Sequence, residues 1–294
     1  MYKISVVVLV YNSTWEDLKF TLESVLEQDL KNYEIIVADD CSKQNWKCEI
    51  EKLFAHNNFR NYSIILHKKN VGTVCNLLGA LEKVSGKYVK PLGAGDAFYD
   101  CNVLKRVTSY MDKYRCRVLF GKMQGYIIEG DNNISYVNFQ TPLDVDVYKE
   151  YNCKRVKKNL QEYQDTIAGV AVFFEYKFLL EYLSQIKGIV KYCEDLLLVE
   201  MAENTKIYYY DSRLMLYQYT TGVSINGKER LLKDRLDYWN YLIHKYPDNK
   251  NYKRGIRIIK IDLLKNSLIR KVLKLCFCPR YFVFYIRHRK NRYK

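Results

Sequence analysis

Polar side chains that suit a nucleotide diphosphate follow three of the apolar runs in the first hundred residues. Tyr11 comes directly after the first run, Asp39 and Asp40 end the second, and Asp96 closes a loop of small residues after the fourth. An aromatic ring can stack on a base, and a carboxylate can accept from a base N–H or a ribose hydroxyl. Another carboxylate can hold a divalent cation against the phosphates. Together these residue types would make a nucleotide-diphosphate site.

The elements that must position these side chains alternate between strand and helix patterns. Continuous β-branched runs are typical of strands buried on both faces, and apolar residues at helical spacing lie between them. We predict an α/β domain with a mainly parallel sheet, in which ligands bind at the carboxyl ends of the strands. Neither a G-x-G-x-x-G after the first strand nor a P-loop motif is present. The expected strands are Ile4–Val10, Glu34–Ala38, Ser63–Leu66 and Lys87–Leu92, and the expected helices are 15–26, Cys48–His56 and Thr73–Val84.

Several short blocks occur in a definite order along the chain. The segment Glu34–Ser42 reads EIIVADDCS, which is close to the signature EIIVVDDGS. The other blocks are Ser5–Asn12, Leu22–Gln28, Asn70–Gly72, Gly86–Val89, Cys193–Asp195, Tyr217–Tyr219 and Gly222–Ser224. Together they resemble the inverting GT-A glycosyltransferases of family 2, which include bacterial capsule and O-antigen transferases. The resemblance is strong over about residues 3–100 and looser over 165–225.

The resemblance implies a GT-A fold, a Rossmann-like mainly parallel sheet flanked by helices, and a role for each matching residue. Tyr11 and Asp40 would contact the base, and Asp39 would be a partly structural neighbour. Asp96 would ligate Mn²⁺ or Mg²⁺. Asp195, with Glu194 beside it, would act as the general base that deprotonates the acceptor hydroxyl. The implied nucleotide-binding set is Val10, Tyr11, Asp39, Asp40, Gly72, Asn76 and Gly95.

The chain departs from the family pattern at the metal-binding motif. The family has an acidic D-x-D or D-x-D-D after the fourth strand, and here Gly93 and Gly95 replace its first two acids. The remaining carboxylate, Asp96, suits a Mg²⁺ that the substrate phosphates help to bind. The depleted motif leaves a second hypothesis open, a GT-A-like domain that binds nucleotide or glycan without turnover.

Each site residue also has a purely structural interpretation. The pair Asp39–Asp40 lies at a strand end, where Asp is common in turns, and Asp96 can cap a helix. The pair Glu194–Asp195 opens a helix, where acids complement the macrodipole. Tyr11 is one of 28 Tyr residues, so that packing alone could explain it, and Asn76 on a helix favours a structural role.

The net charge of +15 is concentrated near the C-terminal end. From Lys253 to Lys294 there are 14 Lys and Arg residues and one acid. A basic amphipathic helix followed by aromatic residues predicts attachment to an anionic membrane surface through residues 253–294. A helix packed on the domain with a solvated basic face is the structural alternative. Nucleic-acid binding is not expected, because it leaves the first 225 residues unexplained. The apolar stripe is Ile258, Ile261, Leu268, Val272 and Leu275.

We divide the chain into a GT-A domain (1–222), a helical extension (223–252) and a basic tail (253–294). We expect no signal peptide, because the first apolar run is too short and lacks a basic flank, and no apolar stretch approaches the roughly 20 residues that cross a bilayer. The Cys residues number nine, without paired or zinc-type spacing, which indicates reduced thiols. We expect a cytoplasmic protein, peripheral on the inner face of the cell membrane. It would transfer a sugar from a nucleotide-diphosphate donor, which the resemblance implies to be UDP-linked, to a glycan or polyprenyl-linked acceptor in bacterial surface polysaccharide synthesis.

Overall fold

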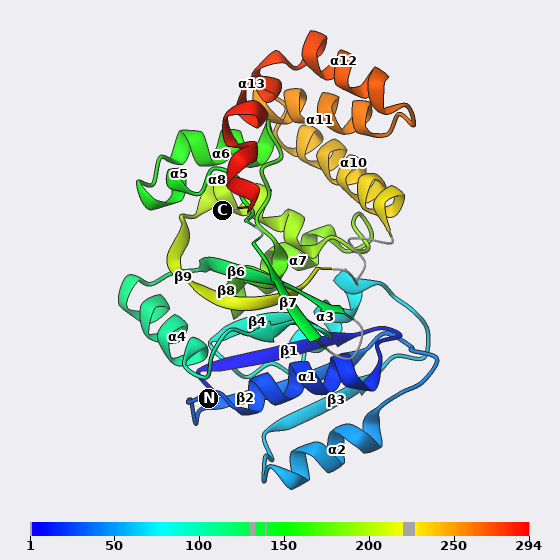
Figure 1. The fold of residues 1–294 in the computed structure, drawn as a ribbon, viewed down its shortest axis with the longest axis vertical. Coiled ribbons are helices and arrows are strands. Elements are labelled where there is room, and N and C mark those ends of the chain that lie inside the picture. Colours follow the sequence, from blue (N-terminus) through cyan, green and yellow to red (C-terminus); the bar gives the residue numbers. More distant parts are fainter. Residues whose placement is uncertain (1, 130–132, 139, 220–226, 294) are drawn as a thin grey trace.

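The computed structural model describes residues 2–129, 133–138, 140–219 and 227–293 (Figure 1). A mixed sheet runs through the body of the molecule, and helices cover both of its faces. Among the described residues the strand order is β3-β2-β1-β4-β8-β6-β9-β5, with β7 paired to β6. The predicted α/β fold class is confirmed. The strands are β1 (Ile4–Val10), β2 (Tyr33–Asp39), β3 (Tyr62–Leu66), β4 (Tyr88–Gly93), β5 (Ala97–Phe98), β6 (Val118–Glu129), β7 (Asn133–Val137), β8 (Val172–Glu175) and β9 (Ile207–Gln218).

The first four strands are parallel, as their apolar pattern predicts. On β1, Val7 packs in the core cluster that contains α3, whereas Val6 and Val8 pack in the cluster that contains α1. Both faces of the strand are therefore buried, which explains its continuous apolar run. The helices of this body are α1 (Trp15–Leu26), α2 (Lys47–His56), α3 (Thr73–Leu81), α4 (Val103–Tyr114), α5 (Asp146–Lys149), α6 (Cys153–Gln161), α7 (Tyr176–Ile186) and α8 (Leu197–Asn204).

The second part of the sheet contains both parallel and antiparallel pairs. β8 is antiparallel to both β4 and β6, and β9 then runs parallel to β6 with register shifts around Lys122. β5 pairs antiparallel with β9, where Ala97 lies opposite Leu216. This pairing brings the end of β9, at Gln218, beside the loop that follows β4.

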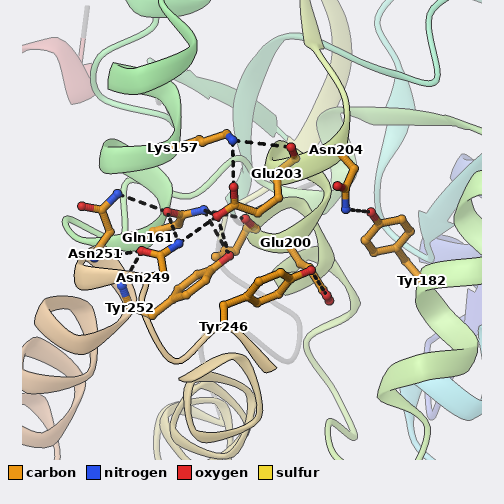
Figure 2. A network of polar contacts seen from close by, with 11 residues as sticks. Lys157, Gln161, Tyr182, Glu200, Glu203, Asn204, Tyr246, Asn249, Asn251 and Tyr252 are labelled. Atoms are coloured by element: carbon orange, nitrogen blue, oxygen red, sulfur yellow. Dashed lines mark hydrogen bonds and ion pairs between the residues drawn. The ribbon is translucent and has the colours of Figure 1, made fainter. Parts of the chain in front are cut away.

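Two C-terminal helices, α10 (Lys228–Lys245) and α11 (Lys250–Asp262), belong to the same core as the sheet. Trp239 and Tyr252 are buried in the cluster that includes α3, α7 and α8. Figure 2 shows a polar network that joins α11 to α6 and α8. In it, Gln161 donates to Glu203 (2.7 Å) and to the Tyr252 hydroxyl (3.1 Å). The network leaves few buried polar groups unmatched where these helices meet.

The apolar stripe predicted across residues 258–275 is not one surface, and this expectation was wrong. Ile258 and Ile261 on α11 are buried beside Cys278, because α11 packs into the protein. α13 (Pro279–His288) also returns to the body, where Phe284 stacks on Tyr163 at 4.7 Å. Unlike α11 and α13, the helix between them, α12 (Ser267–Phe277), has no buried residue. Its exposed apolar side chains are Leu268, Ile269, Val272, Leu275 and Phe277.

The predicted boundary between residues 222 and 223 and the block Gly222–Ser224 lie outside the described residues. α11 begins three residues before the expected boundary at Lys253. Within the described ranges, no helix is both long and apolar enough to span a membrane.

Candidate active site

A cleft of about 390 Å³ opens at the carboxyl ends of β1 and β4, where the ends of β9 and α10 also reach. Residues predicted to bind the nucleotide and residues predicted to provide the general base line this same cleft. Asp39, Gly72 and Gly95 are not part of the cleft wall but hold the loops around it. The predicted site residues that line the cleft are Val10, Tyr11, Asp40, Asn76, Asp96, Glu194 and Asp195.

Tyr11 lies at the mouth of the cleft, on the turn that follows β1. Its side chain is 51% exposed, whereas Val10 before it is buried. Asn12 adopts a left-handed backbone (φ 51°), its N–H donates to Ser42 Oγ, and its Oδ1 accepts from the Lys43 N–H. These bonds fasten the turn to the loop after β2. The ring of Tyr11 is therefore held at an open edge, as stacking on a base requires.

Asp39 and Asp40 organise the loops that border the cleft. Asp39 Oδ1 accepts from the Ser42 N–H at 2.7 Å. Asp40 accepts from the N–H groups of Val71 (2.7 Å) and Gly72 (2.8 Å). Each Asp40 oxygen keeps a second lone pair for a ligand in the cleft. The structural and ligand-binding interpretations of Asp40 are thus compatible.

Gly72 is required by both its backbone and its neighbours. Its φ of +86° lies in the left-handed region, and an added Cβ would lie 2.8 Å from the carbonyl oxygen of Lys191. The Val74 N–H also donates to that oxygen, at 3.1 Å. The loop after β3 therefore packs directly on the segment before Glu194.

Asn76 has one satisfied and one unsatisfied side-chain group. Its Nδ2 donates to the carbonyl of Ala38 at 2.9 Å, whereas its buried Oδ1 has no partner among the described residues. Buried polar atoms without a partner are uncommon. Because Asn76 lines the cleft, this oxygen can accept a hydrogen bond from a ligand.

The loop after β4 explains why an acid is absent at position 95. Gly95 has φ +97°, and a Cβ there would overlap the side-chain carbonyl of Gln218. Its N–H donates to Thr21 Oγ1 at 2.9 Å, and Tyr126 donates its hydroxyl to the Gly95 carbonyl. By contrast, a Cβ at Gly93 would lie 3.4 Å from Asp96 Oδ2, an ordinary contact.

Asp96 is the one loop carboxylate available to a divalent cation. Its Oδ1 accepts from the Gln218 N–H at 3.1 Å, which leaves Oδ2 on the side of Gly93. Burial raises the pKa of Asp96 to about 7. No group of three or more His, Cys, Asp or Glu side chains in the described part of the chain is placed to hold a metal. These donors fit a cation that takes most of its ligands from bound phosphates.

Sequence reasoning missed Lys90, a fully buried cation on β4. Its Nζ donates to the carbonyls of Val170 (2.5 Å) and Val172 (3.3 Å). Burial lowers the pKa of Lys90 to about 7, while the charges of Asp96 and Glu194 oppose this shift. Lys90 therefore lies among the cleft carboxylates and offsets their mutual repulsion. The feature of the sequence that could have indicated Lys90 is a Lys inside an otherwise apolar strand.

Glu194 and Asp195 open a short 3-10 turn (Glu194–Leu196) that leads into α8. Burial raises the pKa of both carboxyls, while the charge of Arg235 and the N–H of Gly169 favour the ionised form of Asp195. A raised pKa suits a general base that works near neutral pH. Arg235, on α10, also lines the cleft and was not predicted, because nothing in its local sequence separates it from a surface arginine.

Comparison with known proteins agrees with this geometry. Residues 5–180 match the model of the family described as Glycosyl transferase family 2. An uncharacterized glycosyltransferase of Rickettsia bellii is 32% identical over 111 residues, which are 38% of this chain and 15% of the relative. The uncharacterized glycosyltransferase YibD of Escherichia coli is 33% identical over 97 residues, 33% of this chain and 27% of the relative. The match thus spans less than a third of either relative.

Solved structures share the fold at low sequence identity. The mannosyltransferase PcManGT of Pyrobaculum calidifontis, in complex with GDP-Man and Mn²⁺, aligns with a TM-score of 0.61 and 15% identity. That alignment covers 92% of this chain and 72% of the other. TarS residues 1–349 of S. aureus, in complex with UDP, aligns with a TM-score of 0.52 and 19% identity, over 81% and 66% of the two chains. Both likenesses support the GT-A arrangement of the sheet.

Proposed function

Because the chain belongs to glycosyl transferase family 2, we propose that it moves a sugar from a UDP-linked donor to a hydroxyl of a glycan or lipid-linked acceptor. The observation that carries this proposal is that one cleft is lined by Tyr11 and Asp96, expected to bind the nucleotide and its cation, and by Glu194 and Asp195, expected to provide the base. TarS, a neighbour in fold, has been solved with UDP-GlcNAc, which supports a nucleotide-sugar partner here.

In the proposed mechanism, displacement is direct and inverts the anomeric carbon. Tyr11 stacks on the base while Asp40 and Asn76 accept hydrogen bonds from the nucleotide. Asp195 takes the proton of the acceptor hydroxyl while the acceptor oxygen forms its bond to the anomeric carbon. The bond from that carbon to the diphosphate oxygen breaks, and its electron pair leaves with the nucleoside diphosphate. Mn²⁺ or Mg²⁺ held at Asp96 would stabilise the charge of the diphosphate.

Binding and turnover test this function together. UDP is expected to bind more tightly than GDP or CDP, because the proposed base contacts are those of a uracil site. Calorimetry with the three nucleotides measures this order, and a panel of nucleotide sugars with Mn²⁺ reports slow hydrolysis or transfer. Nucleotide binding without turnover of any donor and acceptor would favour the alternative, a GT-A-like nucleotide- or glycan-binding domain. The replacement of two motif acids by Gly93 and Gly95 is what favours that alternative.

We further propose that the protein acts on the inner face of the cell membrane, on a polyprenyl-linked acceptor for surface polysaccharide. The predicted membrane segment comprises residues 253–294. Because α11 and α13 pack on the body of the protein, the proposed lipid contact is limited to α12 and the exposed residues around it. On one face of α12, Leu268 is 68% exposed and Val272 51% exposed, and Lys265 and Lys271 are also exposed. An exposed apolar face with a basic border suits an anionic lipid surface.

Replacing Leu268, Val272 and Leu275 together with Ser is expected to weaken binding to phosphatidylglycerol vesicles about 10- to 100-fold, since each removes apolar area from the lipid contact. Cosedimentation with vesicles measures the bound fraction. None of the three side chains is buried, so the fold should persist. The matched control replaces Ile128 and Ile134, exposed apolar residues on β6 and β7, with Ser. Equal binding of the α12 variant and the control would contradict the lipid proposal.

A further inference from the structure

We propose that Asp234, on α10, is a positioning residue that holds the loop carrying the general base Asp195. The inference rests on the proposed function and deepens it. It makes the C-terminal helix α10 part of the catalytic apparatus, although the first 222 residues contain every side chain that the family pattern predicts.

The carboxylate of Asp234 binds three successive backbone N–H groups. It accepts from Tyr192 at 2.6 Å and from Lys191 and Cys193 at 3.2 Å. Only 6% of Asp234 is exposed. A buried carboxylate with several N–H donors makes strong, charge-assisted hydrogen bonds. The loop at 191–193 is therefore fixed directly before Glu194 and Asp195.

A second buried carboxylate holds α10 against the far side of the same segment. Glu200, on α8, accepts from the hydroxyls of Tyr238 (3.3 Å) and Tyr246 (3.0 Å) and pairs with Lys245 at 2.7 Å. Figure 2 shows Tyr246 directed at Glu200. Asp195 thus lies in the sequence between two segments that are bonded to α10, the loop at 191–193 and Glu200.

The fixed loop also connects the base to the nucleotide side. The carbonyl of Lys191 accepts from Val74 and lies against Gly72, whose N–H donates to Asp40. Arg235, the next residue after Asp234, lines the cleft and favours the ionised form of Asp195. A shift of α10 would therefore change both the position and the charge environment of the base. Misplacement of a reacting group by about 1 Å can cost roughly 100-fold in rate.

The test is Asp234→Ala and Asp234→Asn in the full chain, with Asp237→Asn as the matched control on the same helix. Asp234→Ala is expected to lower kcat about 10- to 100-fold, with UDP affinity and donor KM within about threefold of wild type. Asp234→Asn, which keeps one acceptor oxygen, should recover part of that loss. Hydrogen exchange should show faster exchange at the amides of residues 191–193 in Asp234→Ala, and thermal melting should show that it remains folded.

Two results would overturn the inference. One is a wild-type kcat in Asp234→Ala, and the other is a loss of UDP affinity as large as the loss of kcat, which would indicate general disruption of the cleft. Failure of the proposed function looks different, because the wild-type chain itself would then turn over no donor, with or without UDP binding.

Discussion

Replacing Asp195 with Asn is expected to lower kcat about 10²- to 10⁴-fold, the range that a positioned general base contributes. Asn has nearly the same shape but cannot accept the proton of the acceptor hydroxyl. UDP affinity should stay within about twofold, because Asp195 is not among the residues expected to contact the nucleotide. Single-turnover kinetics measure the chemical step, and calorimetry measures UDP binding.

Glu194→Gln is the matched control, since Glu194 is the adjacent carboxylate in the same cleft. A large loss of kcat in Glu194→Gln with normal turnover in Asp195→Asn would assign the base to Glu194 instead. The pH profile gives independent support. Because burial raises the pKa of Asp195, the base is protonated and inactive below that pKa. We therefore expect kcat/KM to fall toward acid pH with a midpoint above about 4, the usual Asp value.

Replacing Asp96 with Asn is expected to remove most of the gain in UDP affinity that Mn²⁺ provides, about 10- to 100-fold, since Asp96 is the loop carboxylate that can share a cation with the phosphates. Gly93→Asp should act in the opposite direction. Its Cβ would make an ordinary contact with Asp96 Oδ2, so a side chain at position 93 would begin beside the first carboxylate. Calorimetry with UDP, with and without Mn²⁺, measures both effects.

Gly93→Ala separates the effect of the added carboxylate from that of the added Cβ. UDP affinity that is identical in wild type with Mn²⁺ and after chelation would contradict a metal at Asp96. In that case Arg235, which lines the cleft, would remain as a charge that balances the diphosphate.

The sheet could be predicted as far as β4 because its signals are local. The β-branched run at Ile4–Val10 and the Asp39–Asp40 pair at the end of β2 determine which edge of the sheet carries the polar side chains. Beyond β4 the order depends on long-range pairing. β8 contributes only four residues between β4 and β6, and no local pattern distinguishes that position from a fifth parallel strand.

The candidate site was predictable where a residue follows a strand or matches a family block, and not where it acts through tertiary packing. Asp234 and Arg235 lie on a helix whose charged residues resemble those of any half-exposed helix, about 40 residues after Asp195. Position 95 shows the reverse case. The sequence shows that the family's acid is missing at position 95. The structure adds that a side chain there would be strained, because φ is +97° and the Gln218 side chain would have to move.

The packing of α10 and α11 also has a consequence for when the active site can form during synthesis. Domains fold from the N-terminus as they are made, at about 5–20 residues per second. Strand β9 ends at Gln218, whereas Asp234 and Tyr252 come later. The residues that hold the loop at 191–193 would therefore be synthesised a few seconds after the last strand of the sheet. The base loop would thus be fixed only after α10 and α11 have been made.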